Sequence, residues 1–153
     1  MSKPSNIKPV LYQLCLNFIE KRIENIEYSL LQARQASNDD TKSSAGDKYE
    51  TTREMMQQEM DRNSKLLYEA GQQKIALQQI ENVDVAKEVK NGSLVFTSEG
   101  NFYISISAGE LKANEQIFYA VSQAAPIGKF LIGKKVGEEF NFNNKTYHLN
   151  QIL

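Results

Sequence analysis

Two long segments of the chain repeat apolar residues at alternating steps of three and four positions. The first segment runs from about Ile7 to Ala36, and the second from about Asp47 to Ile80. The first series consists of Leu16, Ile19, Ile23, Ile26, Leu30 and Ala33. The second consists of Tyr49, Thr52, Met56, Glu59, Asn63, Leu66, Ala70, Gln73, Leu77 and Ile80. This rhythm is typical of coiled-coil helices, and the short connection predicts an antiparallel helical hairpin.

The second series is the weaker of the two, because Glu59, Asn63 and Gln73 occupy seam positions. Four apolar residues beside this seam are expected to share its packing: Met55, Met60, Leu67 and Ile75. Two helices alone bury little apolar surface. Half of a four-helix bundle, completed by dimerisation, is therefore an open alternative.

The connection between the helices, Thr41–Glu50, carries acidic side chains. Asp47 and Glu50 lie three residues apart, and Asp39 and Asp40 lie just upstream. Residues three apart on a helix are neighbours on one side of it, so the carboxylates of Asp47 and Glu50 could point the same way. Carboxylate oxygens are the hard ligands that Mg²⁺ prefers. The hairpin end is thus a candidate metal-ligand pair, with the contribution of Asp39 and Asp40 left open.

The same residues also fit a purely structural role. Ser44 and Asp47 have the spacing of a capping box, in which each side chain bonds a backbone N–H of the other residue. Acids in a first helical turn also suit the helix dipole. Local sequence leaves both the capping role and the ligand role open, and the two can coexist.

After Ile80 the periodicity changes to short β-rich runs bounded by turn residues. Asn82–Lys90 is interpreted as a linker, and a short helix is expected from Pro126 to Gly133. Five strands are predicted: Ser93–Thr97, Phe102–Ser107, Ile117–Val121, Glu139–Phe142 and Thr146–Ile152. The last two are joined across Asn143-Asn144, which tolerate positive φ. The expected class is α+β, with a hairpin over residues 1–81 and an antiparallel sheet with one short helix over residues 82–153.

Composition narrows the functional classes. The 153 residues carry a net charge of −1, which gives no general attraction to nucleic acid or anionic lipid. Cys15 is the single cysteine and is interpreted as a small buried hydrophobe, and His148 is the single histidine, with no zinc-type partner nearby. No apolar run reaches the length of a membrane span, and the N-terminus lacks an apolar signal core. A cytoplasmic protein is expected.

Two motifs, in order, carry a resemblance to a known family. The segment Ala125-Pro-Ile-Gly-Lys-Phe-Leu-Ile-Gly-Lys-Lys-Val-Gly-Glu138 is similar to the signature Ser-Pro-(Ile/Leu)-x-x-x-Leu-(Ile/Leu)-Gly-Lys-x-x-Gly-Asp of the bacterial transcript-cleavage elongation factors, the Gre family. Gly46-Asp-Lys-Tyr-Glu50 is similar to that family's Gly-Asp-x-x-Glu. The resemblance covers nearly the whole chain. It implies an N-terminal coiled-coil hairpin and a C-terminal domain of FKBP-like fold.

The resemblance also implies a function. In the family the hairpin enters the secondary channel of RNA polymerase, and the tip acids help hold the second Mg²⁺ and activate the water that cuts backtracked RNA. Asp47 and Glu50 match those acids. The implied partners are RNA polymerase and the nascent RNA 3′ end. The implied factor is a monomer that is not itself an enzyme and has no cofactor of its own.

The chain departs from the family pattern beside the tip. The family continues Asn-Ala-Glu-Tyr after the glutamate, whereas this chain has Thr51-Thr-Arg-Glu54, so Arg53 stands in place of a third acid. Ala125 and Glu138 replace the first Ser and the final Asp of the signature. These departures favour, as the alternative function, a channel-binding regulator of polymerase that lacks cleavage activity.

The second half of the chain offers two further interpretations. Lys129, Lys134 and Lys135 form a basic patch that is either a solvated surface or a contact with polymerase at the channel mouth. Five aromatic residues are interpreted as core rather than as a prolyl isomerase pocket: Tyr103, Phe118, Phe130, Phe140 and Tyr147. A prolyl isomerase with a chaperone arm stays an alternative, because fold alone does not imply activity.

Overall fold

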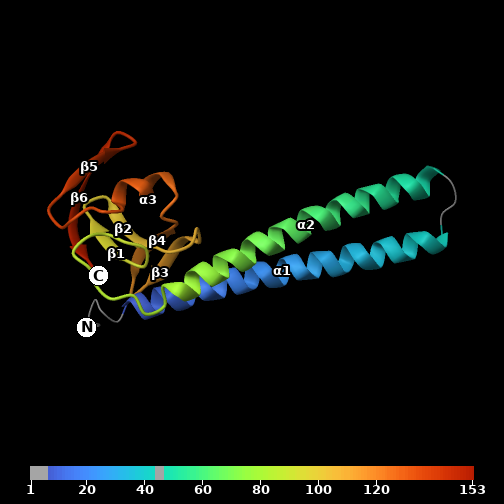
Figure 1. The fold of residues 1–153 in the computed structure, drawn as a ribbon, viewed down its shortest axis with the longest axis horizontal. Helices are drawn as coiled ribbons and strands as arrows, with labels where there is room; N and C mark the ends of the chain where they lie inside the picture. The colour runs from blue at the N-terminus through green and yellow to red at the C-terminus, as the bar shows by residue number, and fades with distance from the viewer. Residues whose placement is uncertain (1–6, 44–46) are drawn as a thin grey trace. The chain divides into compact units, whose positions relative to one another are not determined.

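The computed structural model describes the backbone of residues 7–43 and 47–153, and the side chains of residues 7–36 and 50–153. Helix α1 spans Ile7–Ser43 and helix α2 spans Asp47–Gln79 (Figure 1). The remaining elements are β1 (Leu94–Thr97), β2 (Gly100–Ile104), β3 (Gly109–Ala113), β4 (Gln116–Val121), α3 (Pro126–Leu131), β5 (Glu139–Phe142) and β6 (Lys145–Ile152). The fold class is α+β, as the sequence predicts.

The chain divides into two compact units, and each is described by itself. The hairpin unit comprises residues 19–74, and the sheet unit comprises residues 1–18 and 75–153. The ends of both long helices therefore group with the strands. The division between residues 81 and 82 follows the change of sequence pattern and stays a prediction.

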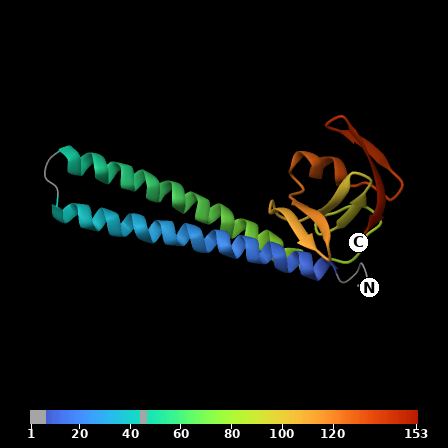
Figure 2. The same cartoon turned by 180° about the vertical axis from the view of Figure 1, so that it is seen from behind.

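In the hairpin unit, the two helices run antiparallel side by side (Figures 1 and 2). The predicted seam of α1 is confirmed, since four of its members are buried: Ile19, Ile26, Leu30 and Ala33. Between the helices, Lys74 Nζ lies 3.8 Å from Glu20 Oε1. The expected share of Met55 and Ile75 in the packing is wrong, because their side chains are 65% and 49% exposed. Met55 lines an open groove between the helices, beside Ala33 and Met56, instead of filling the seam.

Asn63 is the polar residue at the centre of the α2 seam. Its side chain is 7% exposed, and its Nδ2 has no hydrogen-bond partner among the described residues. A buried amide without a partner costs about 1–3 kcal/mol relative to a satisfied one. A single polar residue in a coiled-coil seam fixes the pairing register at such a cost in stability. Asn63 therefore disfavours shifted pairings of the two helices.

Helix α1 is longer than the pattern predicts. The apolar series ends near Ala36, but the helix continues to Ser43. The added residues, 37–43, are polar and contain neither Gly nor Pro. These residues do not interrupt the helix, but they also have no apolar positions at helical spacing that could pack against α2. The connection outside both helices is therefore only residues 44–46, which lie outside the described residues together with the predicted capping box of Ser44.

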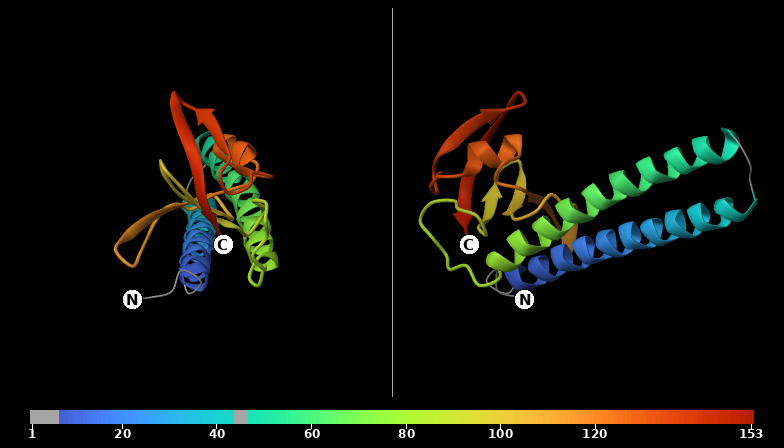
Figure 3. Two further views of the ribbon diagram at one scale, coloured as in Figure 1. Left: turned by 90° about the vertical axis from the view of Figure 1, so that its left-hand side faces the viewer. Right: turned by 45° about the vertical axis from the view of Figure 1, so that its right-hand side comes forward.

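The sheet is mixed and has six strands in the order β3-β4-β2-β1-β6-β5 (Figures 1 and 3). The expectation of five antiparallel strands is wrong in two respects. The five predicted strands do not include β3, which lies between the predicted strands Phe102–Ser107 and Ile117–Val121. The pairing of β2 with β4 is parallel, whereas the other four pairings are antiparallel. Strand β3 carries the chain to the sheet edge, so that β4 returns beside β2.

The two faces of the sheet have different covers. Successive residues of a strand point to opposite faces, so Phe102 and Ile104 face one side and Tyr103 the other. Phe102 and Ile104 belong to an apolar core that includes Leu131 of α3. On the other face, Cys15 of α1 has its Sγ 3.7 Å from Ser105 Oγ. The sheet therefore packs between α3 and the first turns of α1.

The predicted turn of the last hairpin is confirmed. Asn143 and Asn144 have φ angles of 50° and 64° and join β5 to β6. Asn114 and Glu115 form an equivalent turn, with φ angles of 50° and 63°, between β3 and β4. No helix in the described part of the chain combines the length and apolar character needed to span a membrane.

Cys15 is fully buried, as predicted, and it makes the protein's stability sensitive to alkaline pH. Burial raises the pKa of its thiol from 9.0 to about 11, and the hydrogen bond to Ser105 offsets part of that rise. The folded protein therefore holds the thiol proton more tightly than the unfolded chain does. This contribution is complete below pH 9 and is lost as the pH rises through about 11. We expect a loss of roughly 2–3 kcal/mol from this group.

Urea unfolding of the wild type and of Cys15→Ala, at pH 8 and at pH 11, measures this contribution. At pH 8 the variant should be less stable, because it loses packing. That deficit should shrink or reverse by pH 11, because only the wild type must keep a thiol protonated. The buried Tyr103 is present in both proteins, so the rise in its pKa that burial causes is common to both; the smaller rise that the Cys15 charge adds occurs only in the wild type and acts in the same direction as the Cys15 effect. A difference that stays constant with pH would contradict the prediction.

Candidate functional site

The candidate acids lie at the end of the hairpin where α1 and α2 are joined. Asp47 is the first residue of α2, and its side chain lies outside the described residues. Glu50 lies in the first turn of α2, and its side chain is exposed. Within the described part of the chain, Glu50 has no hydrogen bond or ion pair. Its carboxylate is therefore available to a ligand from outside the protein.

Asp39 and Asp40 have backbone in the last turns of α1, and their side chains also lie outside the described residues. Helical geometry puts Asp47 and Glu50 on neighbouring positions of one side of α2, about 4.5 Å apart along its axis. Two carboxylates are too few to enclose a divalent cation. They suit an ion whose other ligands come from a second molecule and from water.

The described residues hold no alternative metal centre. Nowhere in residues 7–36 and 50–153 do three His, Cys, Asp or Glu side chains gather closely enough to bind a metal ion. His148 lies on β6, where its Nδ1 is 3.0 Å from Glu139 Oε2 of the neighbouring strand. Both side chains are more than half exposed. This pair is a surface contact across the β5–β6 hairpin.

The predicted basic patch lies around the end of α3. Lys129 belongs to α3 and is exposed, Lys134 is half-buried, and Lys135 is exposed. Lys135 Nζ lies 3.8 Å from Glu88 Oε1, so part of its charge is offset. The backbone here is well fixed, because Val89 exchanges hydrogen bonds with Gly133 and Lys134 at 2.8 and 2.9 Å. Of the three lysines, Lys129 has a side chain that is both exposed and without an ion pair among the described residues.

Three aromatic residues of the sheet unit, Phe130, Phe140 and Tyr147, form a stacked cluster. Four of the five predicted core aromatics are buried: Tyr103, Phe118, Phe140 and Tyr147. The ring of Phe140 stacks on Tyr147, with centroids 5.0 Å apart, and on Phe130, with centroids 5.7 Å apart. Phe130 itself is 44% exposed, so its assignment to the core is wrong. Helix α3 turns Leu131 inward, which leaves its neighbour Phe130 at the border.

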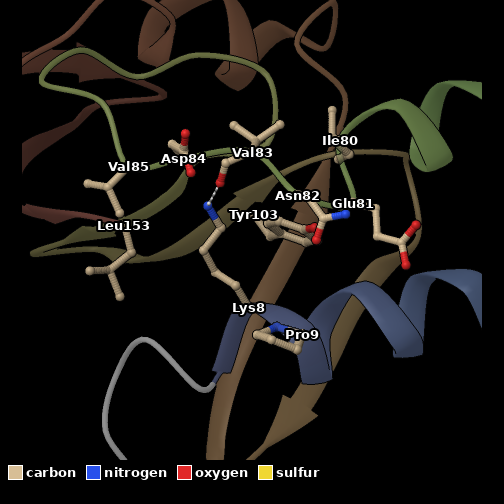
Figure 4. A pocket seen from close by; sticks show the side chains of 10 residues that line it. All are labelled: Lys8, Pro9, Ile80, Glu81, Asn82, Val83, Asp84, Val85, Tyr103 and Leu153. Atoms are coloured by element: carbon tan, nitrogen blue, oxygen red, sulfur yellow. Dashed lines mark hydrogen bonds between the residues drawn. The ribbon is translucent and has the colours of Figure 1, made fainter.

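A cavity of about 330 Å³ lies where the start of α1 meets the segment after α2 (Figure 4). It is lined by Lys8, Pro9, Ile80, Glu81, Asn82, Val83, Asp84, Val85, Tyr103 and Leu153. Lys8 Nζ points across it and donates a hydrogen bond to the carbonyl oxygen of Val83 at 3.4 Å. Burial, and then the charge of Lys90, lower the pKa of the Lys8 ammonium, while Asp84 opposes the change. None of its lining residues belongs to the predicted site, and no motif in the sequence marks it.

Comparison with known proteins adds no family assignment. A scan against protein-family models finds no match to the chain, and a search of curated proteins finds none either.

Proposed function

We propose that the protein is a transcription elongation factor that binds RNA polymerase through its secondary channel and stimulates Mg²⁺-dependent cleavage of backtracked nascent RNA. The observation that carries the proposal is Glu50, an exposed carboxylate in the first turn of α2 that has no partner among the described residues. Asp47, three residues before Glu50 in the sequence, is the second acid of the proposed pair. The helical hairpin, and the sheet with its short helix, are consistent with the coiled-coil and FKBP-like architecture of the Gre family.

The chemistry assigned to the chain is that of a ligand donor. Glu50 and Asp47 would complete the coordination of a Mg²⁺ ion shared with the polymerase. Such an ion makes a bound water more acidic. The carboxylates would also orient that water toward the scissile phosphate by accepting its hydrogen bonds. The polymerase supplies the remaining ligands, so the factor itself is not an enzyme.

The reaction is a hydrolysis of one RNA phosphodiester. The water oxygen forms a new bond to phosphorus, and the bond from phosphorus to the 3′ oxygen of the upstream nucleotide breaks. That oxygen takes up a proton, which leaves a 3′ hydroxyl on the shortened transcript. The released fragment carries the phosphate on its 5′ end. The new 3′ hydroxyl is the end that elongation requires.

The basic patch has a separate role in this proposal. Lys129, Lys134 and Lys135 would contact acidic residues of the polymerase near the channel mouth. Because these lysines are exposed or half-buried, they would contribute mainly to the rate of association and its salt dependence.

Stalled elongation complexes with end-labelled RNA test the proposed function. Polymerase from the same source should shorten its transcript at least tenfold faster when the protein and Mg²⁺ are added. A protein that displaces a genuine cleavage factor but leaves the RNA intact would instead be the channel-binding regulator, which Arg53 favours. A protein that neither cleaves nor competes would contradict both functions.

A further inference from the structure

Arg53 lies one helical turn after Glu50 on α2, and its side chain is exposed. Three residues of α-helix advance about 4.5 Å along the axis and return to within about 60° of the starting direction. Arg53 is therefore beside the acid pair, at the same end of the hairpin. Among residues whose side chains the structure describes, it is the first cation along α2.

The helix contains an internal comparison for this arginine. Glu50 and Arg53 have the same spacing and order as Glu59 and Arg62 on the same helix. Arg62 forms an ion pair and hydrogen bond with Glu59 through its Nη2. Arg53 forms no ion pair with Glu50 or with any other described residue. Equivalent spacing permits pairing one site further along, whereas no residue in the described part of the chain holds the guanidinium of Arg53.

We propose that Arg53 binds the scissile phosphate of the backtracked RNA, and this inference rests on the proposed function. A guanidinium presents two parallel N–H donors that match two non-bridging phosphate oxygens. Negative charge on those oxygens grows as water adds to phosphorus. A fixed cation there stabilises the transition state more than the ground state. Arg53 transfers no proton in this step.

The acidic side chains at the end of the hairpin repel a phosphodiester, and a cation beside them would offset that repulsion. Glu50 and Glu54 are exposed carboxylates on the first turns of α2, and by sequence Asp47 adds a third acid and Lys48 one cation. A phosphodiester that approaches these acids is repelled. A neighbouring arginine offsets that repulsion where the two like charges must meet. In this proposal Arg53, which replaces the third acid of the family pattern, contacts the substrate and does not indicate lost activity.

The test compares three variants in the RNA cleavage assay on stalled complexes. Arg53→Gln removes the charge and the donor pair, whereas Arg53→Lys keeps the charge without the planar pair of donors. Arg62→Gln makes the same change nine residues further along α2, at an arginine that is already paired. For each protein, the cleavage rate at saturating factor and the concentration giving half the maximal rate are measured. Circular dichroism checks that the helix content is unchanged.

Arg53→Gln should lower the saturated cleavage rate about 10- to 100-fold, with the half-maximal concentration unchanged. Arg53→Lys should recover part of that loss, and Arg62→Gln should stay within twofold of the wild type. If Arg53→Gln cleaves as fast as Arg62→Gln, the inference fails while the proposed function stands. A change confined to the half-maximal concentration assigns Arg53 to polymerase binding and also overturns the inference. A wild type that never stimulates cleavage overturns the proposed function and this inference together.

Discussion

The double variant Asp47→Asn, Glu50→Gln is expected to lose nearly all stimulated cleavage while it still binds the polymerase. Both substitutions keep the shape of the side chain and remove the charge that ligates Mg²⁺. Removing a group aimed at a reacting centre costs about 100-fold or more in rate. The loss should appear in the rate at saturating factor. Competition against an active cleavage factor should show that affinity is retained.

The control for this variant makes the same chemical change elsewhere on α2. Asp61→Asn, Glu69→Gln also removes two exposed carboxylates, beginning 14 residues, or about 21 Å, further along the helix than Asp47. It should leave the cleavage rate within twofold of the wild type. First-turn acids also stabilise a helix by about 0.3–1 kcal/mol through its dipole. Thermal unfolding of both variants measures this structural part. If the tip variant cleaves like the control, Asp47 and Glu50 have only the capping role.

The hairpin was largely predictable because its packing follows one repeating rule. A seam residue recurs every three or four positions, so Ile19, Ile26 and Leu30 are buried as the spacing requires. The same rule placed the polar Asn63 inside, where it is buried. The seam rule makes no prediction for segments without apolar residues at these steps. The extension of α1 to Ser43 has no apolar rhythm, and apart from Lys42 it consists of the weak helix formers Ser, Asn, Asp and Thr, so neither the pattern nor helix propensity predicts it.

The sheet was less predictable, because strand partners are set by contacts between distant residues. Strand β3 is a short edge strand whose exposed Glu110 and Lys112 resemble a loop in sequence. Its Gly109 has a φ angle of 75°, which marks a turn but does not end the pairing with β4. The parallel pairing of Phe102 with Tyr119 depends on the path through β3. Missing β3 therefore led to the wrong relation between β2 and β4.

The candidate site shows a similar division. The positions of Asp47 and Glu50 at the start of α2 follow from the sequence, and the helix boundary agrees with them. The missing ion pair between Glu50 and Arg53 does not follow from the sequence, because an arginine three residues after a glutamate is expected to pair with it. The cavity beside Lys8 also had no sequence signal. Its walls come from segments more than 70 residues apart that meet only after folding.

Gly128→Ala is expected to destabilise the sheet unit by roughly 3 kcal/mol, near the upper end of the range for overpacking. A Cβ at Gly128 would lie 2.2 Å from the carbonyl oxygen of Ser122 and 3.1 Å from the Cα of Gln123. Both are backbone atoms, and the Ser122 carbonyl already accepts a hydrogen bond from Ala125 N–H at 3.0 Å. Helix α3 would have to move away. Leu131, which is fully buried in the core, would lose its packing.

A matched control is available in the same protein. Gly71 lies within α2, and a Cβ there would meet no atom within 4 Å. Gly71→Ala should therefore stabilise the protein by about 1 kcal/mol, because alanine favours the helix more than glycine does. Urea unfolding followed by circular dichroism compares the two substitutions. The same added methyl group should lower the unfolding midpoint at one site and raise it at the other. Similar effects at both sites would mean that the backbone at Ser122 and Gln123 gives way to the added methyl group at little cost, and would contradict the prediction.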